Sequence, residues 1–120
     1  MVIKRFEEIH SWQKARELTK TIYTASCRGK FSKDFGLSDQ IRRASVSIMS
    51  DIAEGFSRNS TKDFTRFLRI AQGSAYEVQS ILYVVGDLNY LEDPELKELN
   101  DLVSDVVNLL GGFIRHLQTS

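Results

Sequence analysis

The chain has 120 residues, of which 42% are hydrophobic and 27% charged, and its 16 Lys/Arg balance 16 Asp/Glu. We expect residues 1–120 to form a single domain with its own core. No apolar run reaches the roughly 20 residues that a membrane helix needs, and the N-terminal stretch lacks the apolar centre of a signal peptide. The single cysteine, Cys27, excludes an internal disulfide. It favours a cytoplasmic protein, for which we expect no membrane partner.

The first predicted helix begins at Ser11, a favourable N-cap residue, and ends near Arg28 and Gly29. Apolar residues recur along it at helical spacing. They are Trp12, Ala15, Leu18, Ile22 and Tyr23. Residues 27–36 contain two glycines, mixed charges and no periodicity, and therefore predict a loop.

The second predicted helix starts near Ser38 and ends around residues 55–58. Its apolar stripe also has helical spacing. The stripe consists of Leu37, Ile41, Ala44, Ile48 and Ile52. Ser60 is then a strong N-cap for a third helix, and Asp63 stands at the capping-box position three residues later.

The third and fourth predicted helices carry matched heptad repeats. In the third helix, residues 61–88, the repeat is Phe64, Leu68, Ala71, Ala75, Val78, Leu82 and Val85. In the fourth it is Leu96, Leu99, Val103, Val106, Leu110, Phe113 and Leu117. Asn89 ends the third helix, and Asp93 caps the fourth with Pro94 in its first turn. Steps of three and four residues are typical of left-handed helix packing. We therefore predict an all-α fold, an antiparallel up-and-down four-helix bundle.

The stretch SDIAEGFSRNSTKDFTRF, from Ser50 to Phe67, contains a glycine, small polar residues and a lysine, as phosphate-binding loops do. Such a loop needs a second glycine directly before the lysine and a strand before the loop. Here Thr61 precedes Lys62, and a predicted helix comes first. We interpret the stretch as a corner between two helices.

Basic residues gather around this corner, six against three acidic residues between positions 42 and 72. They are Arg42, Arg43, Arg58, Lys62, Arg66 and Arg69. The four at positions 58–69 are spaced by four, four and three residues and share one face. Arg42 and Arg43 come three to four turns earlier and are expected to flank the same surface. All six are candidate nucleic-acid-binding residues. The alternative is a solvated helix face with i,i+4 ion pairs.

The balanced net charge hides an asymmetry along the chain. Residues 1–76 carry 14 Lys/Arg against 8 Asp/Glu, a net +6, whereas residues 77–120 carry 2 against 8, a net −6. A polarised charge can attract a polyanion to one part of the surface. It can equally hold copies of the domain together, and the sequence leaves both interpretations open.

Tyrosines and glycines mark further surfaces on the predicted helices. Tyr76, Tyr83 and Tyr90 repeat every seven residues, which fits either the edge of the core or a candidate oligomer interface. Gly73 and the pair Gly111–Gly112 lie in helical runs, where each glycine costs about 1 kcal/mol relative to alanine. Close approach of helices is the expected compensation. Whether the fourth helix breaks at the glycine pair is left open.

The sequence predicts no catalytic, cofactor or metal site. His10 and His116 each lack a second ligand at i+3 or i+4. Asp51 and Glu54 share a helix face, but neither has a histidine within sequence reach. These residues do not form a catalytic constellation, so we do not expect an enzyme.

Three stretches resemble a known family. They are FEEIHSWQKARELTKTIY, GLSDQIRRASVSIMSDIAEGFSRNSTKDFTRFLRIAQGSAYEVQSILYV and LGGFIRHL. Between Phe6 and about Leu117 the chain resembles the four-helix-bundle proteins encoded in intervening sequences of bacterial 23S ribosomal RNA genes. This family is also labelled "S23 ribosomal protein". The most specific marks are IRRA at 41–44 and IAEG at 52–55.

The resemblance implies an assembly and a partner. The cellular role of the family is undefined, but its relatives include the accessory protein of diversity-generating retroelements, a basic homopentamer that binds nucleic acid. By resemblance we expect a homopentamer, with RNA or DNA as the candidate partner. Basic residues of the family motif fall on Arg42, Arg43, Arg58 and Arg69. Met49 and Asp51 depart from the motif, which commonly has proline and asparagine there.

Two functions follow as expectations. The first is a non-enzymatic, homo-oligomeric bundle that binds RNA or DNA through a basic face on the second and third helices. The alternative is a protein-interaction or assembly scaffold that binds no nucleic acid, with an unknown protein partner.

Overall fold

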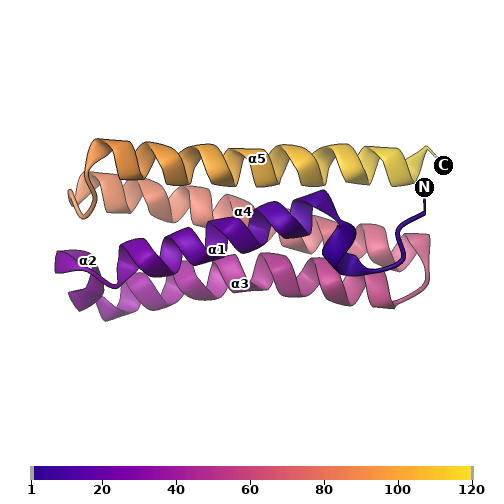
Figure 1. Ribbon diagram of the computed structural model, residues 1–120, viewed down its shortest axis with the longest axis horizontal. Helices are drawn as coiled ribbons and strands as arrows, with labels where there is room; N and C mark the ends of the chain where they lie inside the picture. Colours follow the sequence, from indigo (N-terminus) through magenta and orange to yellow (C-terminus); the bar gives the residue numbers. More distant parts are fainter. Residues whose placement is uncertain (1, 120) are drawn as a thin grey trace.

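The computed structural model describes residues 2–119 as a rod with principal extents of 46 × 20 × 19 Å (Figure 1). Its long helices are α1 (His10–Ser26), α3 (Phe35–Ser57), α4 (Thr61–Asp87) and α5 (Asp93–Gln118). Two short elements complete the structure, a 3-10 turn (Phe6–Glu8) and the helix α2 (Gly29–Lys33). Among these residues no helix combines the length and hydropathy needed to span a membrane.

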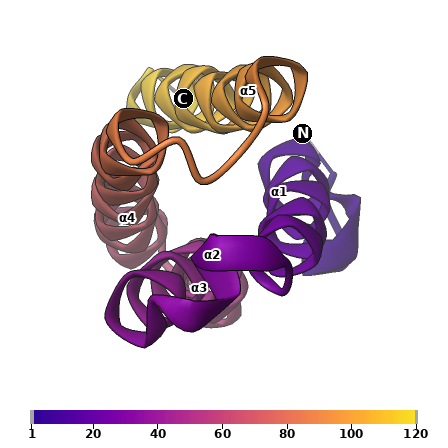
Figure 2. The same ribbon diagram turned by 90° about the vertical axis from the view of Figure 1, so that its left-hand side faces the viewer.

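Each long helix runs opposite to the preceding long helix, and the four surround a common axis when seen end-on (Figures 1 and 2). The helix α1 packs against α3 and α5, and α4 packs against the same two neighbours. This arrangement confirms the predicted antiparallel up-and-down four-helix bundle. It places the α3–α4 corner and the end of α5 at the same end of the rod.

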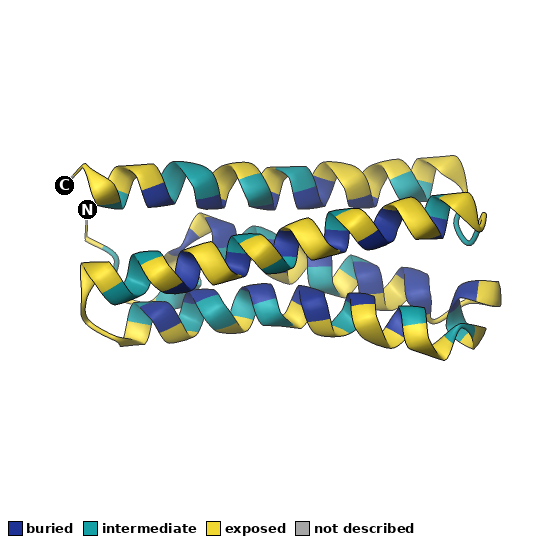
Figure 3. Ribbon diagram, turned by 180° about the vertical axis from the view of Figure 1, so that it is seen from behind, coloured by how far each residue is buried: buried dark blue, intermediate teal, exposed yellow. Residues whose placement is uncertain are grey.

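The predicted heptad repeats supply the centre of the core. The innermost residues of α4 and α5 are at most 1% exposed: Leu68, Ala71, Ala75, Val78, Leu82, Val85, Leu99, Val103, Val106 and Leu110. Buried residues line the inner faces of the helices, as Figure 3 shows. The prediction was wrong for Tyr23, which is 45% exposed. It follows the buried Ile22 by one residue and is therefore turned about 100° away from the core.

Two predicted N-caps are wrong. The N-cap of α1 is Ile9, which makes no side-chain capping bond, and Ser11 is buried inside the first turn, 2% exposed. The N-cap of α5 is Glu92, and Asp93 is the first helical residue. Pro94 lies in the first turn as predicted. Serine favours capping, but Ile9 is buried in the core, 2% exposed, and its carbonyl oxygen accepts from Gln13 N at 3.0 Å, so α1 begins two residues earlier than a Ser11 cap would allow.

Residues 27–36 are not the loop that their composition predicted. They contain α2 and the start of α3. Phe31 is 1% exposed, and its ring stacks on Tyr90 with 5.6 Å between ring centres. The Tyr90 hydroxyl donates to Asp34 Oδ2 at 2.9 Å, while Asp34 Oδ1 accepts from Leu37 N at 3.2 Å and caps α3. This contact between distant segments explains why α3 begins three residues before the predicted start.

The α3–α4 corner depends on a glycine, a left-handed residue and a cap. Ser60 Oγ accepts a hydrogen bond from Asp63 N at 3.3 Å, which confirms the predicted N-cap. Asn59 reverses the chain with a φ of 57°. A Cβ atom on Gly55 would lie only 2.5 Å from the Cβ of Phe67. The two helices can therefore approach this closely only because position 55 is glycine.

The other glycines differ in their surroundings. The helix α5 continues without a break through Gly111 and Gly112. A Cβ atom on Gly111 would lie 3.3 Å from Nε2 of Gln72 on α4, in agreement with the predicted close approach. A Cβ atom on Gly73 would meet nothing within 4 Å, so no close approach within this chain accounts for that glycine.

Candidate nucleic-acid interface

Two arginines at the α3–α4 corner share one aromatic ring. The guanidinium carbon of Arg58 lies 5.0 Å from the centre of the Phe67 ring, and that of Arg66 lies 4.7 Å from it. Arg58 also pairs with Glu54 at 2.8 Å, and Arg66 Nε lies 3.9 Å from an oxygen of Asp63. We call Arg58, Arg66 and Phe67 the corner cluster. Its cation–π contacts hold both guanidiniums at the surface, and the carboxylates neutralise part of their charge.

A shallow hollow of about 570 Å³ opens beside the corner cluster, between α4 and the end of α5. Its lining consists of Thr61, Lys62, Thr65, Arg66, Arg69, Leu117 and Gln118. We call it the α4–α5 hollow. Within the described part of the chain, Lys62 and Arg69 have no carboxylate partner. Three cations and two hydroxyls thus border one surface, which is the chemistry that contacts phosphate oxygens.

Sequence reasoning did not identify the hydroxyls of Thr61 and Thr65 or the contribution of α5. The threonines could have been found from their spacing of four, which puts them beside the basic residues on one helix. The C-terminal residues Leu117 and Gln118 lie about fifty positions away in the sequence. Only the antiparallel pairing of α4 and α5 brings them to the hollow.

The remaining two predicted basic residues lie elsewhere, contrary to expectation. Arg42 Nε donates to Ser26 Oγ at 2.8 Å, and its guanidinium lies 5.0 Å from the centre of the Tyr23 ring. Arg42 therefore belongs to the contact between α1 and α3. At 1.5 Å per residue, it lies about 24 Å along α3 from Arg58. Arg43 is exposed at the same distant level, so the structure separates both residues from the four at positions 58–69.

One carboxylate near the corner is electrostatically unfavourable. Burial, and then repulsion from Glu54, raise the pKa of Asp51 above its ordinary value. Asp51 lies two helical turns before Arg58 on α3. The fold therefore disfavours a negative charge at this position.

The predicted tyrosine stripe is shorter than expected. Tyr76 and Tyr83 are 53% and 77% exposed on α4. Tyr90 does not continue the stripe, because α4 ends at Asp87 and the Tyr90 ring packs against α2. Two further apolar side chains of α4, Ile70 and Val84, are exposed, as is Leu88 at the C-cap of the helix. An apolar outer face on α4 therefore remains as the candidate oligomer interface.

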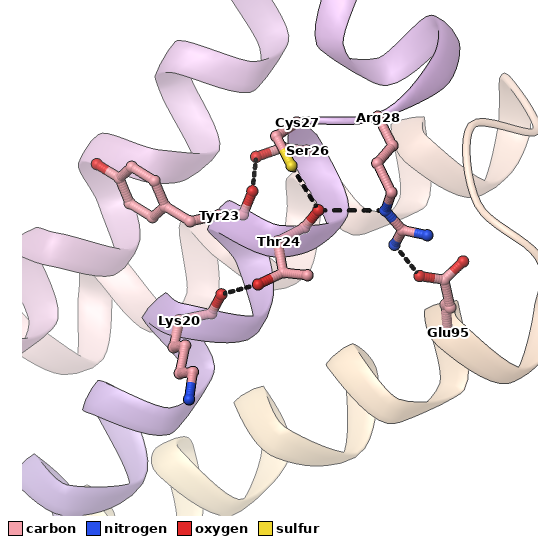
Figure 4. Close-up of polar contacts among 7 residues, drawn as sticks. All are labelled: Lys20, Tyr23, Thr24, Ser26, Cys27, Arg28 and Glu95. Atoms are coloured by element: carbon pink, nitrogen blue, oxygen red, sulfur yellow. Dashed lines mark hydrogen bonds and ion pairs between the residues drawn. The ribbon is translucent and has the colours of Figure 1, made fainter.

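Arg28, at the other end of the bundle, is used within the fold (Figure 4). Arg28 forms an ion pair with Glu95, and its Nε donates to the Thr24 carbonyl oxygen at 3.3 Å. The Cys27 thiol donates to the same oxygen at 3.1 Å. These contacts join the end of α1 to the start of α5. Among residues 2–119, no group of three or more His, Cys, Asp or Glu is placed to hold a metal ion.

The fold and the candidate site define a class of protein, an antiparallel four-helix bundle with a cationic corner at one end. The sequence model of the family "23S rRNA-intervening sequence protein" matches residues 7–112, and the chain belongs to this family. A similar fold occurs in the crystal structure, at 1.70 Å resolution, of a protein of unknown function from the S23 ribosomal protein family of Bacteroides thetaiotaomicron. It has a TM-score of 0.78 and 26% identity, and the match covers 87% of this chain and 97% of that chain. A comparison with curated proteins found no match.

Proposed function

We propose that this protein is a non-enzymatic, homo-oligomeric bundle that binds RNA or DNA through its basic residues at positions 58–69. The observation that carries the proposal is the α4–α5 hollow, where Lys62 and Arg69 have no carboxylate partner in the described chain. Their charges are therefore available to phosphates. The corner cluster adds two arginines that are already positioned at the surface.

The proposed mechanism is neutralisation of backbone phosphates with release of counterions. Each phosphate contact lowers the slope of log K against log salt by about 0.9 for duplex DNA and about 0.7 for single strands. Contacts from lysine, arginine and threonine to phosphate position the protein on the nucleic acid without reading the base sequence. Aromatic rings near the hollow pack among themselves, with Phe56–Phe64 and Phe64–Phe113 centres 5.9 and 5.3 Å apart. We therefore expect weak sequence preference.

The test is a titration of binding against salt, with a structured RNA and a duplex DNA as probes and light scattering in the same buffer. The proposal expects binding at about 50 mM salt with a log–log slope of several units. Charge reversal by Arg69→Glu should weaken binding and reduce the slope while the mass stays the same. The matched control is Arg16→Glu, an exposed arginine on α1. A stable oligomer that binds neither probe at this salt would refute the proposal.

The alternative is an assembly scaffold without nucleic acid, and the outer face of α4 supports it. Tyr76 and Tyr83 are exposed there, and Gly73 leaves open space between them and the basic residues. Acidic residues of α5, including Asp101 and Asp105, border another shallow surface that could pair with the basic corner of a neighbouring copy. Five copies are expected from the resemblance.

The two functions predict different effects of a surface substitution, namely loss of assembly for the scaffold and loss of nucleic-acid binding for the other. Under the scaffold function, Tyr83→Glu on α4 and Arg69→Glu should both reduce the mass measured by light scattering. Under the nucleic-acid function, Arg69→Glu should leave the mass unchanged and weaken binding of the probes. Ser50→Glu, at an exposed position of α3, is a control for added negative charge.

A further inference from the structure

The end of the bundle that holds the α4–α5 hollow contains a long stretch without acidic residues. Residues 64–76 of α4 contain no Asp or Glu, and neither do residues 106–118 of α5. Because α4 and α5 are antiparallel neighbours, these two segments lie side by side (Figure 1). Elsewhere α5 is strongly acidic, with five Asp/Glu between positions 93 and 105. Within these two segments no carboxylate offsets the positive charge, and Asp63, which pairs with Arg66, lies just before the segment of α4.

Arg115 is the arginine of the acid-free segment of α5, and sequence reasoning did not connect it with the basic corner. Long side chains on a helix point back toward its N-terminus, so Arg115 reaches over the preceding turn. A Cβ atom on Gly111 would lie 3.4 Å from Arg115 Nη1, and one on Gly112 would lie 3.8 Å from Nη2. The guanidinium thus lies close above the glycine pair. It has no carboxylate partner in the described chain.

The glycine pair also brings this guanidinium close to α4. A Cβ atom on Gly111 would lie 3.3 Å from Gln72 Nε2, which donates to the Val107 carbonyl oxygen at 3.3 Å. Gln72 and the Arg115 guanidinium therefore flank the same glycine. Arg69 lies three residues before Gln72, about 4.5 Å along the axis of α4. Arg115 on α5 and Arg69 on α4 accordingly border the same α4–α5 seam, with Arg115 beyond the residues that line the α4–α5 hollow itself.

We infer that Arg115 forms the second wall of a two-sided cationic cleft, which holds the phosphodiester backbone of a nucleic acid strand between α4 and α5. The inference rests on the proposed function and extends it to a residue on another helix. The first wall is Lys62, Arg66 and Arg69, which span about 10.5 Å along α4. Cations on both walls of a groove focus the potential inside it more strongly than a single row does. The glycines at 111 and 112 leave the space in which the guanidinium lies.

The test compares three single variants of the full chain, Arg115→Ala, Arg69→Ala and Arg16→Ala. Each removes one exposed arginine, and Arg16 lies on α1, away from the cleft. The readout is fluorescence anisotropy of a labelled RNA hairpin across a salt series, with circular dichroism to verify folding. Loss of one phosphate contact should make the log–log slope less steep by about 0.7–0.9, which is a five- to eightfold loss of affinity at about 0.1 M salt.

We expect Arg115→Ala and Arg69→Ala to make the slope of log K against log salt less steep by the same amount, while Arg16→Ala retains the wild-type slope. If Arg69→Ala loses slope and Arg115→Ala behaves like Arg16→Ala, the second wall is refuted and the proposed function stands. If all three variants lose slope equally, the effect is one of total charge, and the cleft is refuted. If the wild-type protein does not bind the hairpin at about 50 mM salt, the proposed function fails and the inference fails with it.

Discussion

The close approach of α3 and α4 at Gly55 predicts a loss of stability in Gly55→Ala. Ordinary van der Waals contacts of a Cβ lie at 3.4–4 Å, and the added methyl would lie 2.5 Å from Phe67 Cβ. That neighbour is bonded directly to the backbone and cannot rotate away, so α4 itself must shift by about 1 Å. Overpacking of this kind costs about 1–3 kcal/mol. Alanine in a helix recovers about 1 kcal/mol relative to glycine, which offsets part of this cost.

Gly36→Ala is the matched control, because position 36 lies in the same helix and an added Cβ there meets nothing within 4 Å. Urea unfolding followed by circular dichroism should place Gly55→Ala about 1–3 kcal/mol below Gly36→Ala. With an unfolding entropy of about 2.1 cal/mol/K per residue, 1 kcal/mol corresponds to roughly 4 °C in Tm for this chain. A Gly55→Ala protein that melts at or above Gly36→Ala would refute the reasoning.

Three further substitutions test other parts of the structure. Asp51→Asn should stabilise the protein at pH 7. Because the pKa of Asp51 is raised in the folded state, the wild-type protein loses stability as pH rises through that pKa and this carboxyl ionises. The stability gained by Asp51→Asn should therefore vanish below the ordinary pKa of 3.8. Equal urea midpoints of the two proteins at pH 7 would contradict this. Ser60→Ala should cost about 1 kcal/mol in thermal melts, because the cap of α4 is lost, and an unchanged Tm would exclude the cap. Tyr90→Phe should lower Tm at neutral pH. The hydrogen bond to Asp34 raises the pKa of Tyr90, so the difference from wild type should be full below pH 10.0 and shrink above it; a difference independent of pH would argue against this bond.

The core and the four long helices could be predicted from the sequence because their signals are local. The alternating three- and four-residue steps of α4 fix which side of the helix is apolar, and residues from Leu68 to Val85 on that side are buried as predicted. The same holds for α5 from Leu99 to Leu110. The Ser60 cap was also predictable, since its bond to Asp63 spans three residues.

Part of the candidate site could be predicted for the same reason. The spacing of Lys62, Arg66 and Arg69 places all three on one side of α4, and they line one hollow. Arg58 joins them because it precedes the tight corner at Asn59. Helical spacing gives the face of a residue with good accuracy, but only within a single helix or across a short turn.

Contacts between distant segments were decided by the tertiary structure alone. Tyr90 fitted the heptad spacing of α4, yet its hydroxyl bonds Asp34, 56 residues away, and its ring leaves the stripe. Arg42 belonged to the same basic set as Arg58, but its bond to Ser26 places it in the α1–α3 contact near the other end of the rod. Periodicity records the direction of a side chain around its own helix axis. It does not record which neighbouring helix lies there or at what height, and the packing of the four helices supplies both.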